Sequence, residues 1–176
     1  ALNYTADLIP SDSYVYDDWF SYDLVLISAG NNGSNFSTTL KDDLLSFVAA
    51  GGKLLVEGGE VGFNNRADAE FSANVLHMQS WKADIATGIS VQDPDHAVMS
   101  VPNIITGPIN LVYAGYGDSD LVIPAADATW PANWANALTR ASIVCYHPNP
   151  APEGGQIVYF TFNYSALDAA ARIDVL

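Results

Sequence analysis

The chain has 176 residues, which suits a single domain, and 49% of them are hydrophobic, enough to bury a substantial core. Its formal net charge is −14, because 20 acidic side chains face only 6 lysines and arginines, and these basic residues do not cluster. Such a charge disfavours nucleic acids and anionic membranes as partners. No apolar run approaches the roughly 20 residues that span a bilayer, so we expect one acidic globular domain over residues 1–176 without membrane insertion.

The composition favours an extracellular location. Lys and Glu are scarce, whereas Asp, Asn, Ser, Thr and Tyr are abundant, a bias typical of secreted or cell-surface proteins. The single cysteine, Cys145, excludes an internal disulfide but leaves the redox compartment open. Because the chain begins at Ala1 without a methionine and shows no signal peptide, we predict that it is a processed or excised part of a longer multidomain protein.

The first third of the chain predicts a strand–helix–strand unit. Residues 4–9 alternate weakly and form a short candidate strand. Residues 24–28 (LVLIS) are a continuous apolar run, typical of a central parallel strand covered on both faces. A helix should follow and end at Gly51, before a second strand over residues 53–56. The apolar stripe of that helix consists of Leu40, Leu44, Phe47 and Val48.

The rest of the chain predicts a second helix and then shorter elements. Apolar residues at helical spacing indicate a helix over residues 67–80, with a stripe formed by Phe71, Val75 and Met78. Beyond it, the better strands are residues 141–146 and 156–163, and Ser165 is a candidate cap of a final helix. Shorter β-like pieces, separated by proline and glycine turns, lie around Ile85, Ile104, 111–113 and 121–123.

Several segments together carry a resemblance to a known family. Residues 22–30 read YDLVLISAG, residues 47–56 read FVAAGGKLLV, and residues 58–62 form the turn GGEVG. This combination resembles the class I glutamine amidotransferase-like superfamily, and most of all its versions inside large secreted bacterial proteins, where the turn often reads Gly-Gln-Asp-Ile-Gly. The late strand GQIVYFTF over residues 155–162, followed by a helix with Arg172, is similar as well. The resemblance implies an α/β, flavodoxin-like fold with a mostly parallel sheet flanked by helices.

The resemblance also implies that a part of the usual fold is missing from this chain. The superfamily places a strand and a helix before the segment that aligns with residues 4–9, and the sequence has no counterpart of them. That strand normally lies at the middle of the sheet, so its absence would expose unpaired strand edges. We expect another part of the parent protein, or a second chain, to cover those edges.

The turn at residues 58–62 raises the question of catalysis. In active amidotransferases it carries a cysteine nucleophile, partnered by a later histidine and a carboxylate, whereas this chain has Glu60 there. One interpretation is a hydrolase in which Glu60 acts as nucleophile or general base with Glu57 or His96. The other is a structural acid that accepts hydrogen bonds from amides at the start of the following helix.

Cys145 is the other candidate nucleophile. Strand alternation places it on the same face as His147, and a cysteine–histidine pair suits acyl transfer. A lone cysteine in a strand is, however, usually a small buried hydrophobe. His77, next to Met78 in the predicted helix, is interpreted as structural.

Two groups of polar residues are candidate binding sites. Loops that leave the carboxyl ends of neighbouring parallel strands border one cleft in open α/β sheets. A neutral sugar or a cation would suit the candidates at that edge, which are Asn31, Asn32, Ser34, Asn35, Glu57 and Glu60. Two acidic turns hold candidate metal ligands: Asp93 and Asp95 could bind a metal ion together with His96, and Asp118 and Asp120 offer oxygen ligands of the kind that calcium takes. The alternatives are a hydrophilic rim and solvated turns. We therefore predict no cofactor, with calcium as the one candidate.

These observations favour a module with a degenerate active site. Because Glu60 replaces the cysteine, we predict a non-catalytic binding, assembly or spacer module of a secreted or cell-surface bacterial protein. Its expected partners are other domains or chains of the parent assembly, with carbohydrate as a further candidate. The alternatives are a hydrolase that uses Glu60 with Glu57 or His96, and a cysteine hydrolase that uses Cys145 with His147.

Overall fold

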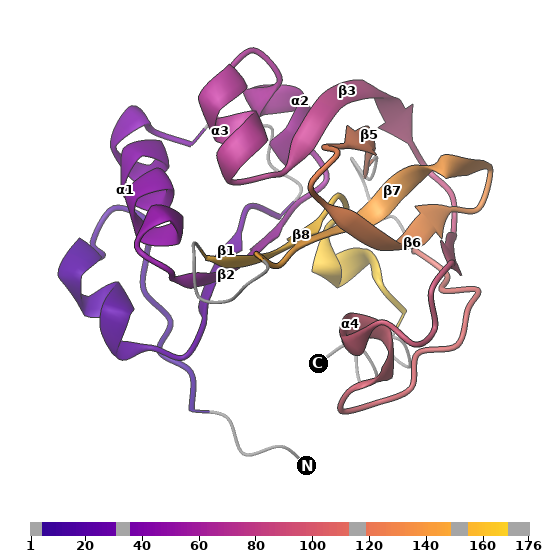
Figure 1. The fold of residues 1–176 in the computed structure, drawn as a ribbon, viewed down its shortest axis with the longest axis horizontal. Helices are drawn as coiled ribbons and strands as arrows, with labels where there is room; N and C mark the ends of the chain where they lie inside the picture. Colours follow the sequence, from indigo (N-terminus) through magenta and orange to yellow (C-terminus); the bar gives the residue numbers. More distant parts are fainter. Residues whose placement is uncertain (1–4, 31–35, 113–118, 149–154, 169–176) are drawn as a thin grey trace.

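The computed structural model describes residues 5–30, 36–112, 119–148 and 155–168, which form one mixed β-sheet with helices on its faces (Figure 1). The strand order is β1-β2-β8-β7-β5-β3, while β6 pairs with β7, and β4 with β6. The sheet curls strongly into an open half-barrel. Its strands are β1 (Val25–Ser28), β2 (Lys53–Glu57), β3 (Met78–Ile85), β4 (Ile89–Val91), β5 (Ser119–Pro124), β6 (Thr129–Trp134), β7 (Ala137–Tyr146) and β8 (Gln156–Phe160). The helices are η1 (Tyr16–Ser21), α1 (Thr38–Ala49), α2 (Val61–Asn65), α3 (Ala69–Asn74), α4 (Ala97–Ser100) and η2 (Tyr164–Ala166), where η marks a 3-10 helix.

The predicted strand–helix–strand unit is confirmed at β1, α1 and β2. Strands β1 and β2 pair in parallel, with Val25 opposite Leu54. Helix α1 begins after Ser37, whose hydroxyl accepts a hydrogen bond from the Leu40 amide at 3.1 Å. The chain leaves the helix through Gly51, whose φ of +93° favours glycine. Caps and apolar spacing, both local features, therefore define this unit.

The expectation of a flavodoxin-like, mostly parallel sheet is wrong. Strands β1, β2 and β8 are mutually parallel, but β7 is antiparallel to β8, and the pairs that involve β3, β4, β5 and β6 are antiparallel as well. A parallel pair needs a crossover of about a dozen residues or more, usually a helix. Between β3 and β7 the described residues hold one helix, the four-residue α4, and short turns connect β5, β6 and β7. The sheet therefore has a parallel part and a larger antiparallel part.

The single helix expected over residues 67–80 is also wrong. Helix α3 is short, and the chain turns at His77, whose φ is +44°, before β3 begins at Met78. Phe71, Val75 and Met78 are nevertheless all buried in one cluster. Residues of a helix, a turn and a strand thus share the apolar spacing that predicted one helix.

Four shorter predictions also differ from the structure. Residues 5–9 form no strand, and Ile104 is exposed in a loop. Leu111 makes only an isolated bridge, to Leu167. Ser165 lies within η2, and the final helix expected after it falls outside the described residues.

Strand β1 lies at the edge of the sheet, although its apolar sequence predicted a central strand covered on both faces. Among the described strands it pairs with β2 alone. Leu24 and Leu26 keep 50% and 49% of their surface exposed. The sheet therefore ends at the apolar strand β1, and the outer side of that strand is open.

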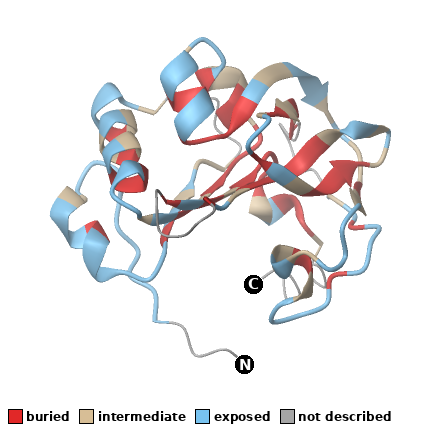
Figure 2. Cartoon of the chain, in the orientation of Figure 1, coloured by how far each residue is buried: buried red, intermediate tan, exposed pale blue. Residues whose placement is uncertain are grey.

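Two apolar clusters lie on opposite faces of the sheet and contain most of the buried residues (Figure 2). On one face, α1 and α3 pack on β1, β2 and β8. On the other, Met99 of α4 packs with Trp134 of β6. Strand β7 contributes to both, because Val144 belongs to the first cluster and Ile143 to the second, as the alternation of a strand requires. No helix in the described ranges is both long enough and apolar enough to cross a bilayer.

Gly58 lies where the turn after β2 passes close to β1 and α2. A Cβ atom here would lie 2.8 Å from the Ala29 Cβ and 2.9 Å from the Val61 Cγ2. We expect Gly58→Ala to lower the free energy of unfolding by about 1–3 kcal/mol, measured by urea denaturation. Ala29→Gly should recover part of that loss, because it removes one of the two clashes. An unchanged unfolding midpoint in Gly58→Ala would contradict this close packing.

Candidate functional site

Glu57, the last residue of β2, is a buried acid that joins three segments. It is 4% exposed, and its carboxylate accepts hydrogen bonds from the Ser28 hydroxyl and from the Tyr164 backbone N–H, the latter at 2.7 Å. Ser28 ends β1, and Tyr164 begins η2, which follows β8 in the chain. The carboxylate therefore ties β1, β2 and the segment after β8 together.

The turns that follow β1 and β2 lie against each other, as expected for the carboxyl ends of neighbouring parallel strands. The Ala29 N–H donates to the Glu57 carbonyl at 2.9 Å, and the Gly59 N–H donates to the Gly30 carbonyl at 3.3 Å. Of the predicted cleft, the structure describes Glu57 and Glu60. Its four other members fall outside the described residues: Asn31, Asn32, Ser34 and Asn35.

Glu60 precedes α2 but makes no capping hydrogen bond through its side chain. The cap comes from Asp120 of β5, whose carboxylate accepts hydrogen bonds from the Gly62 and Phe63 N–H groups at 2.5 and 3.1 Å. The Tyr159 hydroxyl donates to the same carboxylate at 3.2 Å. Asp120, a calcium-ligand candidate in the sequence, is thus a helix cap in the structure.

The environment of Asp120 changes its ionisation. Burial raises its pKa to about 7, while the hydrogen bonds from Gly62, Phe63 and Tyr159 oppose the shift. The nearby charge of Glu60 raises the pKa further. Asp120 therefore titrates near neutral pH, far above an ordinary aspartate.

His96 and its neighbouring acids form a hydrogen-bonded turn. The His96 Nδ1 accepts a hydrogen bond from the Val98 N–H at 3.2 Å and caps α4, and its Nε2 lies 3.3 Å from the Thr129 hydroxyl. Asp93 accepts a hydrogen bond from the Asp95 N–H at 3.2 Å, and both acids are exposed. Asp118, the fourth metal-ligand candidate, falls outside the described residues. Within the described ranges, no group of three or more histidine, cysteine, aspartate or glutamate side chains is placed to hold a metal ion.

Cys145 lies inside the second apolar cluster, whereas His147 is exposed. Burial raises the pKa of the thiol to about 12. Since the thiolate is the nucleophilic form, this environment keeps Cys145 protonated and unreactive at neutral pH.

His77 has contacts that its sequence position did not reveal. Its ring stacks on Tyr146 with the centroids 3.7 Å apart, and its Nδ1 lies 3.1 Å from an Asp127 carboxylate oxygen. Burial lowers the pKa of His77, although Asp127 opposes the shift. These contacts hold the turn between α3 and β3, in agreement with the structural role predicted for His77.

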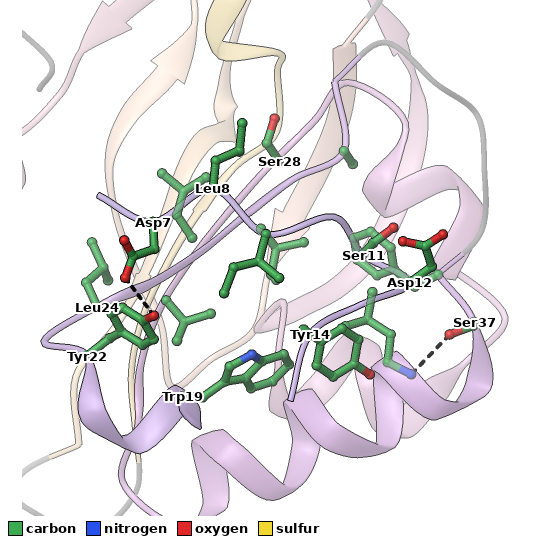
Figure 3. Close-up of a pocket in the computed structure, with 17 residues that line it drawn as sticks. Asp7, Leu8, Ser11, Asp12, Tyr14, Trp19, Tyr22, Leu24, Ser28 and Ser37 are labelled. Carbon is green, nitrogen blue, oxygen red and sulfur yellow. Dashed lines mark hydrogen bonds between the residues drawn. The ribbon is translucent and has the colours of Figure 1, made fainter. Parts of the chain in front are cut away.

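A pocket of about 760 Å³ lies along β1 (Figure 3). It is lined by the N-terminal segment at residues 7–12, by residues 24–29 around β1, and by the beginning of α1. Trp19 and Tyr22 add aromatic surface. Its lining includes none of the candidate catalytic residues Glu57, Glu60, His96 and Cys145. Sequence patterns missed this pocket, because an apolar run carries no mark of an edge strand.

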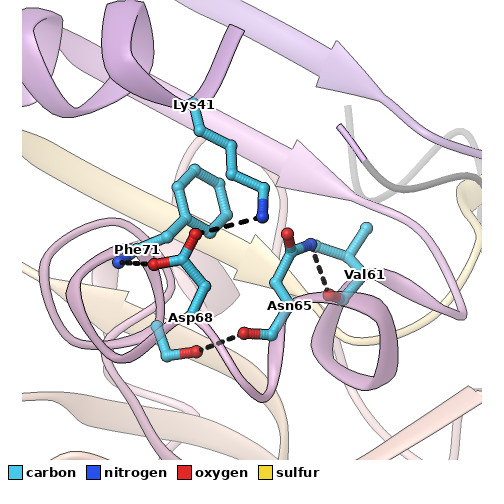
Figure 4. A network of polar contacts seen from close by, with 6 residues as sticks. Lys41, Val61, Asn65, Asp68 and Phe71 are labelled. Carbon is cyan, nitrogen blue, oxygen red and sulfur yellow. Dashed lines mark hydrogen bonds and ion pairs between the residues drawn. The ribbon is translucent and has the colours of Figure 1, made fainter. Parts of the chain in front are cut away.

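A second, more open hollow is bordered by residues of α1, α2 and α3, where a polar network joins the helices (Figure 4). The Lys41 ammonium lies 3.1 Å from Asp68, which also caps α3 by accepting a hydrogen bond from the Phe71 N–H. The Phe71 hydrogen bond and Lys41 hold the pKa of Asp68 below its ordinary value. The Asn65 side chain donates to the Val61 carbonyl at 2.8 Å. Most of these polar groups bond within the fold, but among the described residues the buried Asn65 Oδ1 has no hydrogen-bond partner.

Comparisons with known proteins identify the fold but no family. No family model matches the sequence, and no curated protein matches it either. The structure is similar to the cytoplasmic protein STM3548 from Salmonella typhimurium, with a TM-score of 0.57 and 12% identity over 89% of this chain. It is also similar to a cold-adapted β-galactosidase from Rahnella sp. R3, with a TM-score of 0.64 and 16% identity over 96% of this chain. A third similar structure is the cytoplasmic protein STM1381 from Salmonella typhimurium LT2, with a TM-score of 0.57 and 13% identity over 88% of this chain.

This chain corresponds to only a part of each of those proteins. It spans 65% of the two Salmonella proteins and 23% of the β-galactosidase. At such low identities the similarity concerns the fold alone. None of the three is named as an amidotransferase, so that resemblance, like the expected secretion, stays a prediction.

The raised pKa of Asp120 predicts a pH-dependent stability. Its pKa is about 7 in the folded chain and about 3.9 in an unfolded one, so between these values only the native state keeps the proton. The stabilisation from this proton is therefore fully present below about pH 4 and is lost as the pH rises to about 7. We expect a contribution with a slope of up to about 1.4 kcal/mol per pH unit in that window.

Asp120→Asn should flatten this dependence, as measured by urea denaturation at about pH 5 and about pH 8. His77, whose pKa is lowered by burial, acts in the opposite direction, so only the comparison with the parent chain isolates Asp120. Asp42→Asn, at an exposed position of α1, is the matched control. An Asp120→Asn chain with the pH dependence of the parent would contradict the buried titration.

Proposed function

We propose that this chain is a non-catalytic module that binds or assembles with another polypeptide through the open side of β1. One observation carries the proposal: the pocket of about 760 Å³ with an exposed apolar rim lies along β1 and not at the candidate catalytic residues. Leu24 and Leu26 are half exposed there, and Leu8 across the pocket is 99% exposed. Apolar surface of this kind, next to an open strand, is typical of an interaction site.

The contacts of the candidate catalytic residues support the same proposal. Glu57 is buried and accepts hydrogen bonds from two parts of the fold, so both of its oxygens have structural partners. The Cys145 thiol is buried with a raised pKa. Both ring nitrogens of His96 have a polar partner close by. The alternative hydrolase then depends on Glu60, which lies partly buried at the start of α2 beside Asp120.

A hydrolysis screen tests the proposal against that alternative. Chromogenic glycosides, esters and amides are incubated with the parent chain and with Glu60→Gln and Cys145→Ala, while Glu70→Gln at an exposed position of α3 is the control. We expect no hydrolysis above the buffer rate from any of these proteins, each with unchanged circular dichroism. Turnover by the parent chain that is lost in Glu60→Gln or Cys145→Ala, but kept in Glu70→Gln, would overturn the proposal.

A further inference from the structure

The open side of β1 presents backbone hydrogen-bonding groups. The Ala29 N–H points to β2, since it donates to the Glu57 carbonyl at 2.9 Å. Alternate residues of a strand direct their backbone N–H and C=O groups to opposite sides. The backbone groups of Val25 and Ile27 therefore face β2, whereas those of Leu24, Leu26 and Ser28 face the open side. Among the described residues, no backbone hydrogen bond connects this side to the N-terminal segment. The edge can therefore accept another strand.

The two outer strands of the main strand path differ in how they are protected. The pairing of β3 with β5 has register irregularities, and β3 carries the exposed charged residues Lys82 and Asp84. Bulges and charges are the usual means by which an edge strand avoids pairing with another chain. Strand β1 pairs in regular register, and the backbone groups on its open side belong to Leu26 and Ser28 and to Leu24, which precedes the strand. Among the described residues, β1 is thus the outer strand without register irregularities or charged side chains.

The size of the pocket suits a single strand. A residue of a packed strand occupies roughly 160 Å³, from a rise of about 3.3 Å, a strand spacing of about 4.8 Å and a sheet spacing of about 10 Å. The volume of about 760 Å³ therefore holds about five residues, comparable to the four of β1. The wall at residues 7–12 is held at its beginning, where Tyr22 donates to Asp7 at 2.8 Å, and beyond its end, where Tyr14 donates to Asp43 at 2.6 Å.

Charge and aromatic contacts narrow the choice of occupant. The charged residues that line the pocket are Asp7 and Asp12, both acidic. A second copy of the chain would bring a further net charge of −14 and its own N-terminal segment to this site. Both disfavour the pairing of two β1 edges. A sugar would need an open aromatic face, but Trp19 is 5% exposed and contacts Tyr14 and Phe47. Tyr22 is 36% exposed, and its hydroxyl already donates to Asp7. A polypeptide strand without acidic residues fits best.

We infer that the pocket receives one extended, apolar strand of about five residues, flanked by basic residues, which adds to the sheet beside β1. This inference rests on the proposed function and specifies its partner. Side chains of the added strand alternate between Leu24 and Leu26 on one face of the sheet and Val25 and Ile27 on the other, so both of its faces are apolar. Its basic ends lie near Asp7 and Asp12.

Hydrogen exchange with a synthetic strand tests the inference. The probe is the capped peptide Lys-Val-Ile-Val-Thr-Val-Lys, and the same peptide with proline at its centre is the control. At about 1 mM of the first peptide we expect the amides of Leu24, Leu26 and Ser28 to exchange at least about fivefold more slowly, with no effect of the proline peptide. Amides of β3, the other outer strand, should not change.

Surface variants locate the effect. Leu26→Lys and, independently, Leu24→Lys should weaken peptide binding at least about tenfold, because each places a charge on the apolar edge. Leu138→Lys is the matched control, since Leu138 is 62% exposed on β7 and does not line the pocket. Equal binding by all three variants would overturn the assignment to β1.

Three other outcomes overturn the inference. One is the absence of slowed exchange with the first peptide, in which case the non-catalytic role still stands or falls by the hydrolysis screen. Another is concentration-dependent dimerisation in sedimentation that protects the same amides without peptide, which would identify a second copy as the occupant. The last is protection by soluble oligosaccharides and not by the peptide, which would identify a sugar site.

Discussion

The hydrogen bonds to the Glu57 carboxylate are the interaction on which the parallel part of the sheet depends. One buried acid binds the end of β1 through Ser28 and the segment after β8 through the Tyr164 backbone. An acid that lost these donors would remain buried without compensation, which is strongly unfavourable, so the three segments are constrained together. Glu57 therefore has a structural role at the end of β2 that does not depend on catalysis. Gly58, which follows it, allows the close approach of the turn to the Ala29 side chain at the end of β1.

Asp120 has a corresponding position between the antiparallel strands and α2. It comes from β5, and it accepts hydrogen bonds from the first amides of α2 and from Tyr159 of β8. Helix α2 has only five residues, too few to be stable without tertiary contacts, so the cap from a distant strand contributes much of its stability. Two buried acids therefore connect the turn after β2 to both parts of the sheet. Their hydrogen-bond donors explain how an acidic chain keeps carboxyl groups inside its core.

Sequence patterns predicted those elements whose deciding contacts are local. The stripe of α1 and its glycine exit lie within fifteen residues of one another, and this unit was predicted correctly. The sheet was not, because pairing brings together residues that are far apart in the chain. Whether the apolar run of β1 becomes a central or an outer strand depends on its neighbours and not on its own composition. For the same reason, Asp120 looked like a ligand in a loop, although its partners Gly62 and Tyr159 make it a cap.

The contacts that position the pocket also suit the strand partner that we propose for it. Glu57 holds the end of β1 through Ser28, and two tyrosine–carboxylate hydrogen bonds hold the N-terminal segment opposite. A strand that enters between them meets surfaces already in place, so the loss of conformational freedom falls mainly on the partner. Catalysis would need a free reactive group at the same place, and the described lining offers leucines, aromatic rings, hydroxyls and two outer aspartates. The site is therefore an open strand edge, of the kind that is stabilised by backbone hydrogen bonds and apolar contacts with another strand.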